Sequence, residues 1–252
     1  MKIAVCLKQV PARDWQPRLN DARTWIREED AAFEMNEPDQ YALEEGLRLK
    51  EAQGGEVVVC SAGPPRAAQV LREGLARGAD RAIHVEADGL AGADGFVVAG
   101  ALAAAMRDER FDLVLTGLQS EDQGLAQTGV ILAERLGFPH ATIVMDVRID
   151  KASLRVKREL EGGWFQWVGM GLPAVLTVQS GINQLRYATL KGIMAAKKKE
   201  IRKAAVPLEP ARVRIAHLYV PEKSKKTHMI GGSPADAARE LVRRLRDDAR
   251  VL

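Results

Sequence analysis

The chain has 252 residues, a length typical of one large domain or of one domain with an extension. Apolar residues make up 46% and charged residues 28%, which excludes disordered, collagen-like and coiled-coil chains. The 37 Lys and Arg residues nearly balance the 34 Asp and Glu residues, so the formal net charge of +3 argues against a dedicated nucleic-acid-binding protein. Cys6 and Cys60 are too few for a disulfide framework and fit no zinc-binding spacing, which favours a reducing compartment.

The first residues contain too short an apolar run for a signal peptide and no small-residue cleavage site, so we expect a cytoplasmic protein. Residues 162–185 carry no charged side chain and are long enough to span a bilayer. Glycine, proline, glutamine, serine and asparagine interrupt this stretch, and a spanning helix would bury their polar groups at high cost. We therefore predict strands and turns there, and a protein that is not embedded in a membrane.

Short β-branched runs alternate with amphipathic stretches over the first 145 residues. The runs predict buried strands at residues 3–7, 56–61, 81–85, 112–116 and 141–145. Asn36, with Asp39 three positions later, predicts the capped start of a first helix. This helix is predicted to span residues 36–53. Three further helices are predicted at residues 64–78, 93–107 and 125–136. This alternation indicates an α/β fold with a Rossmann-like, mostly parallel sheet and helices on both faces.

The pattern changes after residue 145. Strands are predicted at residues 153–159, 163–168 and 174–178 without intervening helices, with Gly162 and Gly163 forming a tight hairpin turn. Residues 181–210 show no clear strand and predict a long surface loop with at most a short helix. A final helix is expected at residues 233–246, with Ser233 as its cap and Pro234 in its first turn. We thus divide the chain into residues 1–180, a nucleotide-binding domain, a loop and basic segment at 181–210, and a C-terminal arm and helix at 211–252.

Candidate binding loops follow from this topology, because ligands of open α/β sheets bind beyond the carboxyl ends of the strands. They are residues 8–11, 62–65 and 116–128. The third is rich in glycine and hydroxyl groups and enters a helix directly, which favours a phosphate. It matches neither GxGxxG nor GxxxxGK[ST], so an ordinary loop capped by Ser120 or Thr128 remains the alternative.

Other candidate sites are weaker. Adjacent Glu121 and Asp122 are more typical of helix-dipole complements than of a metal or acid–base pair. The four histidines are scattered and show no metal-binding spacing. The lysines at 197–199 are typical of a solvated face, and no nucleophile motif is present.

Several segments together resemble one family, the β subunit of electron transfer flavoprotein, in its AMP-binding, non-bifurcating form. The most specific is Asn-Gln-Leu-Arg-Tyr-Ala-Thr-Leu at residues 183–190. The others, in order along nearly the whole chain, are residues 2–11, 35–39, 42–45, 78–81, 112–129, 158–163, 172–175, 193–194 and 196–199.

The resemblance implies an electron-carrier subunit with no catalytic residues, paired in a heterodimer with an α subunit that holds the redox FAD. It implies an AMP site with no redox role, comprising Cys6, Asn36, Glu37, Pro38, Asp39, Ala62, Gly117, Leu118, Gln119, Ser120, Glu121, Asp122, Gln123, Gly124, Leu125, Ala126, Gln127 and Thr128.

The resemblance also implies a surface that docks flavin-dependent dehydrogenases, with Leu190 as its apolar anchor, comprising Tyr187, Ala188, Thr189, Leu190, Ile193 and Met194. Residues 181–210 then become a partner-recognition loop, and residues 211–252 an arm that packs on the α subunit. Glu159 resembles the acidic residue that tethers the mobile FAD domain. Arg13 lies where the family brings its β subunit near the flavin, although some members have an aromatic residue there.

Several alternatives remain open. The same fold could serve a stand-alone adenine-nucleotide sensor, or a bifurcating β subunit with a second FAD. A nucleic-acid binder would account for the lysine run alone, and an ATP-using enzyme is disfavoured because an SGGxDS-type loop is absent. Against the bifurcating pattern, residues 121–129 agree only at Ala126, Gln127 and Gly129. The hydroxyl of Thr128 favours a terminal phosphate, and hence AMP.

Overall fold

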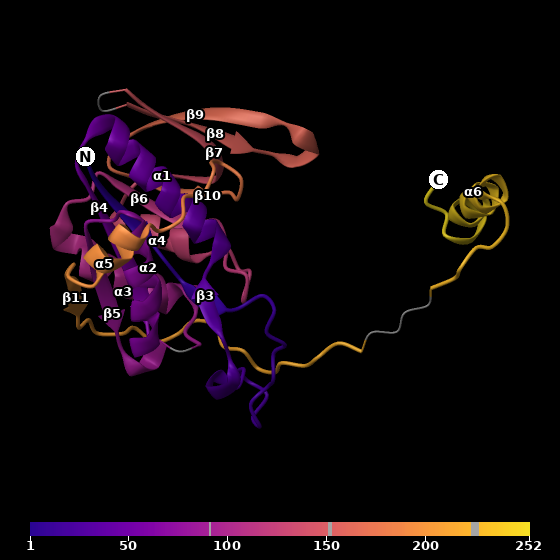
Figure 1. The fold of residues 1–252 in the computed structure, drawn as a ribbon, viewed down its shortest axis with the longest axis horizontal. Coiled ribbons are helices and arrows are strands. Elements are labelled where there is room, and N and C mark those ends of the chain that lie inside the picture. The colour runs from indigo at the N-terminus through magenta and orange to yellow at the C-terminus, as the bar shows by residue number, and fades with distance from the viewer. Residues whose placement is uncertain (91, 151–152, 223–226) are drawn as a thin grey trace. The chain divides into compact units, whose positions relative to one another are not determined.

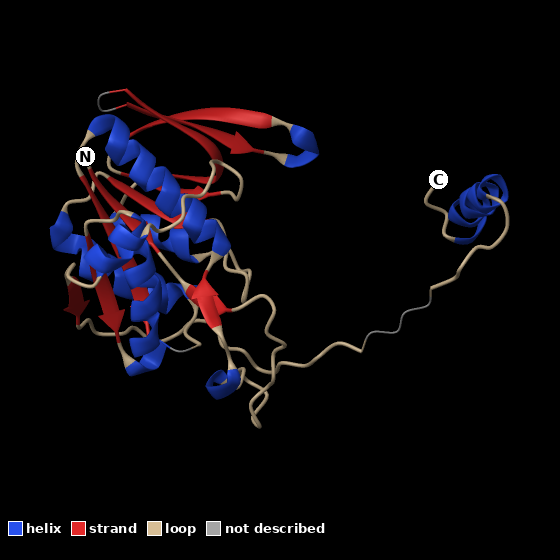
Figure 2. Ribbon diagram, in the orientation of Figure 1, coloured by secondary structure: helices blue, strands red, loops and turns tan. Residues whose placement is uncertain are grey.

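The computed structural model describes residues 1–90, 92–150, 153–222 and 227–252. The chain divides into two units, Met1–Leu218 and Tyr219–Leu252, and each is described by itself. Within the described residues, a nine-stranded sheet forms the centre of the first unit (Figures 1 and 2). Its strands are β1 (Lys2–Cys6), β4 (Glu56–Gly63), β5 (Arg81–Glu86), β6 (Leu113–Gly117), β7 (His140–Asp150), β8 (Ser153–Glu159), β9 (Phe165–Gly171), β10 (Ala174–Val178) and β11 (Ile201–Ala204).

The strand order is β11-β5-β4-β1-β6-β10-β7-β8-β9. The seven strands from β11 to β7 run parallel, and β1 lies between β4 and β6, with Ile3 opposite both Val57 and Leu113. The strand order therefore reverses at β1, and the carboxyl ends of β1, β4 and β6 meet at one edge. The predicted α/β fold with a mostly parallel sheet is confirmed.

β7, β8 and β9 form an antiparallel extension of the sheet. The predicted hairpin is present, but its connection spans residues 160–164 and is closed by a 2.8 Å hydrogen bond from the Leu160 nitrogen to the Trp164 oxygen. Gly162 and Gly163 both adopt positive φ angles in it, at 69° and 77°. The expected two-residue turn is thus wrong, since the strands separate earlier and β9 begins at Phe165 rather than Gly163.

Helices cover both faces of the sheet, as Figure 2 shows. On one face lie α1 (Glu37–Gln53), α2 (Ala68–Arg77) and α5 (Leu190–Ala196), and on the other α3 (Gly95–Met106) and α4 (Thr128–Leu136). Fully buried aliphatic side chains from the sheet and from the covering helices form a core on each face. Single 3-10 turns occur at Glu28–Asp30, Pro65–Ala67, Asp88–Leu90, Arg107–Glu109 and Glu161–Gly163.

Four sequence predictions need correction. Residues 181–210 do contain a strand, β11, which extends the sheet beside β5. The fourth helix begins at Thr128 instead of Leu125, because Gly124 and Ala126 adopt positive φ angles that a helix excludes. Two short strands, β2 (Gln9–Pro11) and β3 (Phe33–Met35), form a separate antiparallel pair that the periodicity did not indicate. Asn36 does lie at the start of α1, but its side chain does not cap the helix.

The second unit contains α6 (Pro234–Arg243), which is followed by a π-helical turn, Arg244–Asp248. The Ser233 hydroxyl accepts a hydrogen bond from the Asp236 nitrogen at 3.2 Å, and Pro234 occupies the first turn. The predicted cap and helix are therefore confirmed. Across both units, no helix within the described residues is long and apolar enough to cross a membrane.

Candidate functional site

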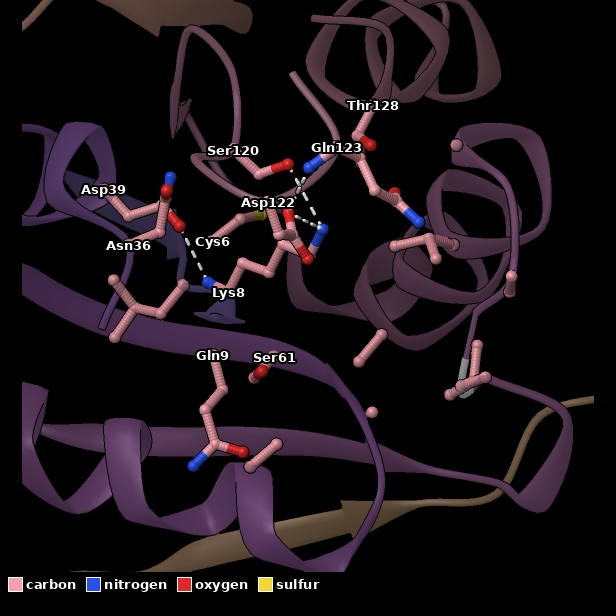
Figure 3. Close-up of a pocket in the computed structure, with 18 of the residues that line it drawn as sticks. Cys6, Lys8, Gln9, Asn36, Asp39, Ser61, Ser120, Asp122, Gln123 and Thr128 are labelled. Carbon is pink, nitrogen blue, oxygen red and sulfur yellow. Dashed lines mark hydrogen bonds and ion pairs between the residues drawn. The ribbon is translucent and has the colours of Figure 1, made fainter. Parts of the chain in front are cut away.

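A pocket opens at the carboxyl ends of β1, β4 and β6, where the strand order reverses (Figure 3). All three loops expected from topology contribute to its lining. The residues implied for a nucleotide site gather here, apart from Glu37, Pro38, Glu121 and Gly124, which lie nearby in the same segments. The lining residues of that set are Cys6, Asn36, Asp39, Ala62, Gly117, Leu118, Gln119, Ser120, Asp122, Gln123, Leu125, Ala126, Gln127 and Thr128.

Asn36 and Asp39, at the start of α1, connect two of these loops. The Asp39 carboxylate accepts hydrogen bonds from the backbone nitrogens of Lys8 at 2.7 Å and Gly117 at 2.9 Å. The Asn36 amide donates to the Gln119 oxygen and accepts from the Glu121 nitrogen, each at 3.0 Å. These two side chains therefore hold the loops after β1 and β6 instead of capping α1. Burial raises the pKa of Asp39 to about 6, against the hydrogen bonds that lower it.

The two carboxylates of the third loop are each paired with a cation. The ammonium of Lys8 lies 2.7 Å from Asp122 and 3.2 Å from the Ser120 hydroxyl, as Figure 3 shows. Arg13 bridges Glu121 and Glu37 with its guanidinium group. Because both loop carboxylates are neutralised, they do not oppose an anion at the adjacent helix start. The expectation that they complement the dipole of the following helix is wrong, because α4 begins only at Thr128 and has no acidic residue in its first turn.

The first turn of α4 faces the pocket. Its N-terminal position, Gln127, makes no side-chain hydrogen bond to the turn, and neither Ser120 nor Thr128 caps it within the described structure. A Cβ atom on Gly129 would lie 2.6 Å from both Thr116 Oγ1 and Thr177 Cγ2, so this turn contacts the sheet directly. Free backbone N–H groups and the positive end of the helix dipole at such a turn favour an anion.

Part of the pocket lining is apolar or buried. Cys6 and Cys60 lie opposite each other on β1 and β4, and burial raises the pKa of both thiols, that of Cys60 to about 12. Leu90, from the 3-10 turn before α3, and Val98 and Leu102, from α3, also line the pocket. In the described structure, the Ser61 hydroxyl lines the pocket, is 1% exposed and has no hydrogen-bond partner. A buried unpaired hydroxyl of this kind is suited to bind a polar ligand atom.

The residues implied for partner docking lie on another surface. Tyr187 is 91% exposed, and Leu190, the first residue of α5, is 84% exposed. Ile193 and Met194 are also exposed, while Thr189 caps α5 by accepting a 3.0 Å hydrogen bond from the Gly192 nitrogen. Ala188 is half-buried between them. Glu159 ends β8, away from the pocket-lining loops in sequence and in the sheet order.

The lysine run was predicted to be a solvated face, and this holds for Lys197 and Lys198 only. Lys199 is half-buried, and its ammonium donates hydrogen bonds to the backbone oxygens of Leu75 and Ala79 at the end of α2. Among the described residues, no group of three or more His, Cys, Asp or Glu side chains is arranged to hold a metal ion.

Comparison with known proteins places the chain in a family. The model described as the electron transfer flavoprotein domain matches residues 24–209. Electron transfer flavoprotein subunit beta of Methylophilus methylotrophus is 37% identical over 256 residues, covering 96% of this chain and 97% of that protein. The chain belongs to the electron transfer flavoprotein β-subunit family. The mitochondrial electron transfer flavoprotein subunit beta of Oryza sativa subsp. indica is 36% identical over the full length of both chains. Electron transfer flavoprotein subunit beta of Bacillus subtilis is 33% identical, covering 90% of this chain and 91% of that protein.

For this β-subunit family member, the loops of the pocket could be predicted from the sequence, but the contribution of Leu90 and of Val98 and Leu102 on α3 could not. Leu90, Val98 and Leu102 carry no polar group that would have distinguished them from core residues. Ser61 was also missed, although it interrupts an otherwise apolar strand, Val57–Cys60, directly before Ala62. A single hydroxyl in a fully buried strand was the one available signal.

Proposed function

We propose that the chain is the β subunit of a heterodimeric electron transfer flavoprotein and that its pocket binds AMP. The observation that carries the proposal is the pocket itself, whose lining combines apolar side chains with the uncapped start of α4. A planar base fits against the apolar side chains, and a monophosphate fits the backbone N–H groups of the helix start.

The residues present fit AMP in three further respects. The unpaired Ser61 hydroxyl supplies a polar partner in the pocket lining. Lys8 and Arg13 neutralise the loop carboxylates, so the charge of a phosphate meets no unpaired anion there. Thr128 places a hydroxyl at the helix start, where it can donate to a terminal phosphate oxygen. This last feature favours AMP over a second FAD, whose pyrophosphate must continue past that position.

In this proposal the α subunit holds the FAD, which supplies the electron-carrying chemistry when bound. The β subunit contributes a fixed frame: Glu159 tethers the FAD domain, and Arg13 lies close to the flavin. Residues 187–194 dock the flavin-dependent dehydrogenase that donates the electrons. Leu190 is suited to anchor the contact, because a buried leucine contributes about 1.5 to 3 kcal/mol.

Nucleotide stoichiometry tests the proposal. The purified heterodimer is heat-denatured, and the released nucleotides are separated by chromatography and quantified against protein. We expect AMP and FAD in near-equal amounts. Two FAD per heterodimer with no AMP would show a bifurcating subunit instead. A homo-oligomer that retains adenine nucleotide but no flavoprotein partner would support the stand-alone sensor.

A further inference from the structure

An exposed apolar ridge is formed by Tyr187, Leu190, Ile193 and Met194. These four side chains, within eight residues, are 91%, 84%, 43% and 62% exposed. Leu190, Ile193 and Met194 have the i, i+3 and i+4 spacing that places side chains on one face of a helix, and an exposed apolar face of this kind marks a contact site for a partner. The ridge consists of an irregular segment and a seven-residue helix, which on their own would be poorly ordered in water.

The segment before the ridge is fixed to α1 by Arg186. Its guanidinium group donates to both oxygens of Glu44, at 2.7 and 3.0 Å, and to both oxygens of Glu51, at 2.5 and 3.1 Å. Arg186 thus makes two bidentate ion pairs. Glu44 is only 5% exposed, so the pair with Glu44 is shielded from solvent. Three residues earlier, the Asn183 amide donates to the Tyr41 oxygen at 3.1 Å.

The second half of the ridge segment and the residues that follow it are fixed to α2. Gly192 lies so close to α2 that a Cβ atom there would collide with the backbone oxygen of Ala76. Arg72 donates hydrogen bonds to the backbone oxygens of Ala196 at 2.6 Å and Lys199 at 2.7 Å. The ridge is therefore held at both ends by side chains that take no part in its exposed surface.

We propose that Arg186 is a positioning residue for partner docking, which holds the ridge in its binding conformation before the partner arrives; this rests on the docking function proposed above. A preformed ridge avoids the entropic cost of ordering the segment on binding. Exposed Lys191 follows Leu190 in α5, and exposed Lys197 and Lys198 come directly after this helix. The partner surface that complements them is an apolar pocket bordered by acidic side chains.

The ion pairs of Arg186 with Glu44 and Glu51 are called the clamp below. Hydrogen exchange on the FAD-loaded heterodimer tests whether the clamp holds the ridge. In Arg186→Gln, we expect the amides of residues 187–194 to exchange about tenfold faster, the loss of protection expected when about 1.4 kcal/mol of local stability is removed. Arg48→Gln is the matched control, because Arg48 also pairs with Glu44, at 3.4 Å, but belongs to α1 itself. In Arg186→Lys, we expect part of the protection of these amides to remain, because lysine keeps the positive charge but cannot make the bidentate hydrogen bonds. Unchanged exchange in Arg186→Gln would overturn the clamp.

A second variant covers the case in which Arg186→Gln does not fold. Glu51 is 59% exposed, so Glu51→Gln removes one of the two ion pairs of Arg186 without leaving a buried charge. We expect a smaller increase in amide exchange in this variant. No increase in this variant would equally overturn the clamp.

Steady-state kinetics separates positioning from docking itself. The electron donor is whichever flavin-dependent dehydrogenase of the source organism reduces the wild-type heterodimer fastest. In Arg186→Gln, we expect the KM for the heterodimer to rise about tenfold with kcat nearly unchanged. Faster exchange with an unchanged KM would overturn the positioning role alone. An unchanged KM in Leu190→Ala would instead overturn the docking function.

Discussion

The Asp39 carboxylate accepts the backbone N–H of Gly117 at 2.9 Å, across 78 residues of sequence. The contact is possible only because residue 117 is glycine: a Cβ atom there would collide with the same carboxylate oxygen and lie 2.7 Å from the Pro38 Cβ. The start of α1 and the end of β6 are thus in direct contact. The pocket-lining loop that follows Gly117 is held in place by this contact.

Gly117→Ala is expected to disturb the pocket more than the fold. The added methyl group pushes α1 away from β6, at a cost of about 1 to 3 kcal/mol in the free energy of unfolding. The loop then shifts, so the heterodimer should lose most of its AMP during purification. Nucleotide content and thermal unfolding measure the two effects. Gly169→Ala is the control, because no atom lies within 4 Å of its Cβ position. Full AMP content in Gly117→Ala would separate this contact from the binding site.

Among the residues that the structure describes, two buried hydroxyls without hydrogen-bond partners offer a matched pair. Ser61 lines the pocket, whereas Thr177 is equally buried but is not part of the lining. If AMP satisfies Ser61, then Ser61→Ala should weaken AMP binding about tenfold, or about 1.4 kcal/mol. Thr177→Val should leave binding unchanged, because it removes only an unsatisfied group. Titration of the nucleotide-depleted heterodimer with AMP, followed by calorimetry, gives both constants. Equal effects of the two substitutions would argue against a ligand contact at Ser61.

We expect that Leu190, the proposed apolar anchor, can be replaced without loss of stability. Leu190 is exposed at the first position of α5, so Leu190→Ala should leave the melting temperature nearly unchanged. The rate of electron transfer from the dehydrogenase at limiting heterodimer should fall at least about tenfold. Met229→Ala serves as the control, since Met229 is 90% exposed but belongs to the second unit. A wild-type rate in Leu190→Ala would place docking elsewhere.

Glu109 accepts hydrogen bonds from Lys2 at 2.7 Å, Arg81 at 2.6 Å and Arg202 at 2.9 Å, near the amino ends of three strands. Burial raises the pKa of this carboxyl, but the hydrogen bonds from Arg81 and Lys2 outweigh it and lower the pKa to about 2. The unfolded value is about 4.3. Because the folded value is the lower one, the stabilisation is present above about pH 4.3 and is lost as the pH falls toward 2.

Glu109→Gln should therefore reduce the free energy of unfolding at pH 7, by about 1 to 3 kcal/mol. The difference from wild type should shrink steadily as the pH is lowered from 5 to 2.5. Urea unfolding across this range measures it. The exposed Glu134→Gln on α4 is the control and should show little difference at any pH. A difference that stays constant with pH would rule out the ionised carboxylate as its source.

Much of the sheet could be predicted, because strands buried on both faces are continuous apolar runs such as Val57–Cys60. β11 was missed because it is an edge strand whose Arg202 and Lys203 side chains reach solvent, so its apolar signal is reduced to its ends. The start of α4 was placed too early because Leu125 has the helical spacing but is 52% exposed. The spacing of apolar residues does not show which of them are buried in the core.

The location of the site could be predicted from the topology, but the long-range hydrogen bonds that hold its loops together could not. Asn36 has the sequence context of a helix cap, and a local interpretation cannot anticipate partners 83 and 85 residues away, at Gln119 and Glu121. The same holds for Arg186, whose partners Glu44 and Glu51 lie on α1. Contacts of this range depend on the folded arrangement of the strands and helices between them.

The place of β10 in the sheet governs the order in which the protein can be completed during synthesis. β10 is bonded on both sides, to β6 and to β7, yet it follows both in the chain. Until residue 178 leaves the ribosome, both neighbours present open edges of apolar strand, the kind of surface on which nascent chains aggregate. We therefore expect the gap between β6 and β7 to be filled only after both strands have been synthesised, by insertion of β10. Chains truncated between residues 150 and 174 should consequently accumulate as aggregates rather than as soluble half-proteins.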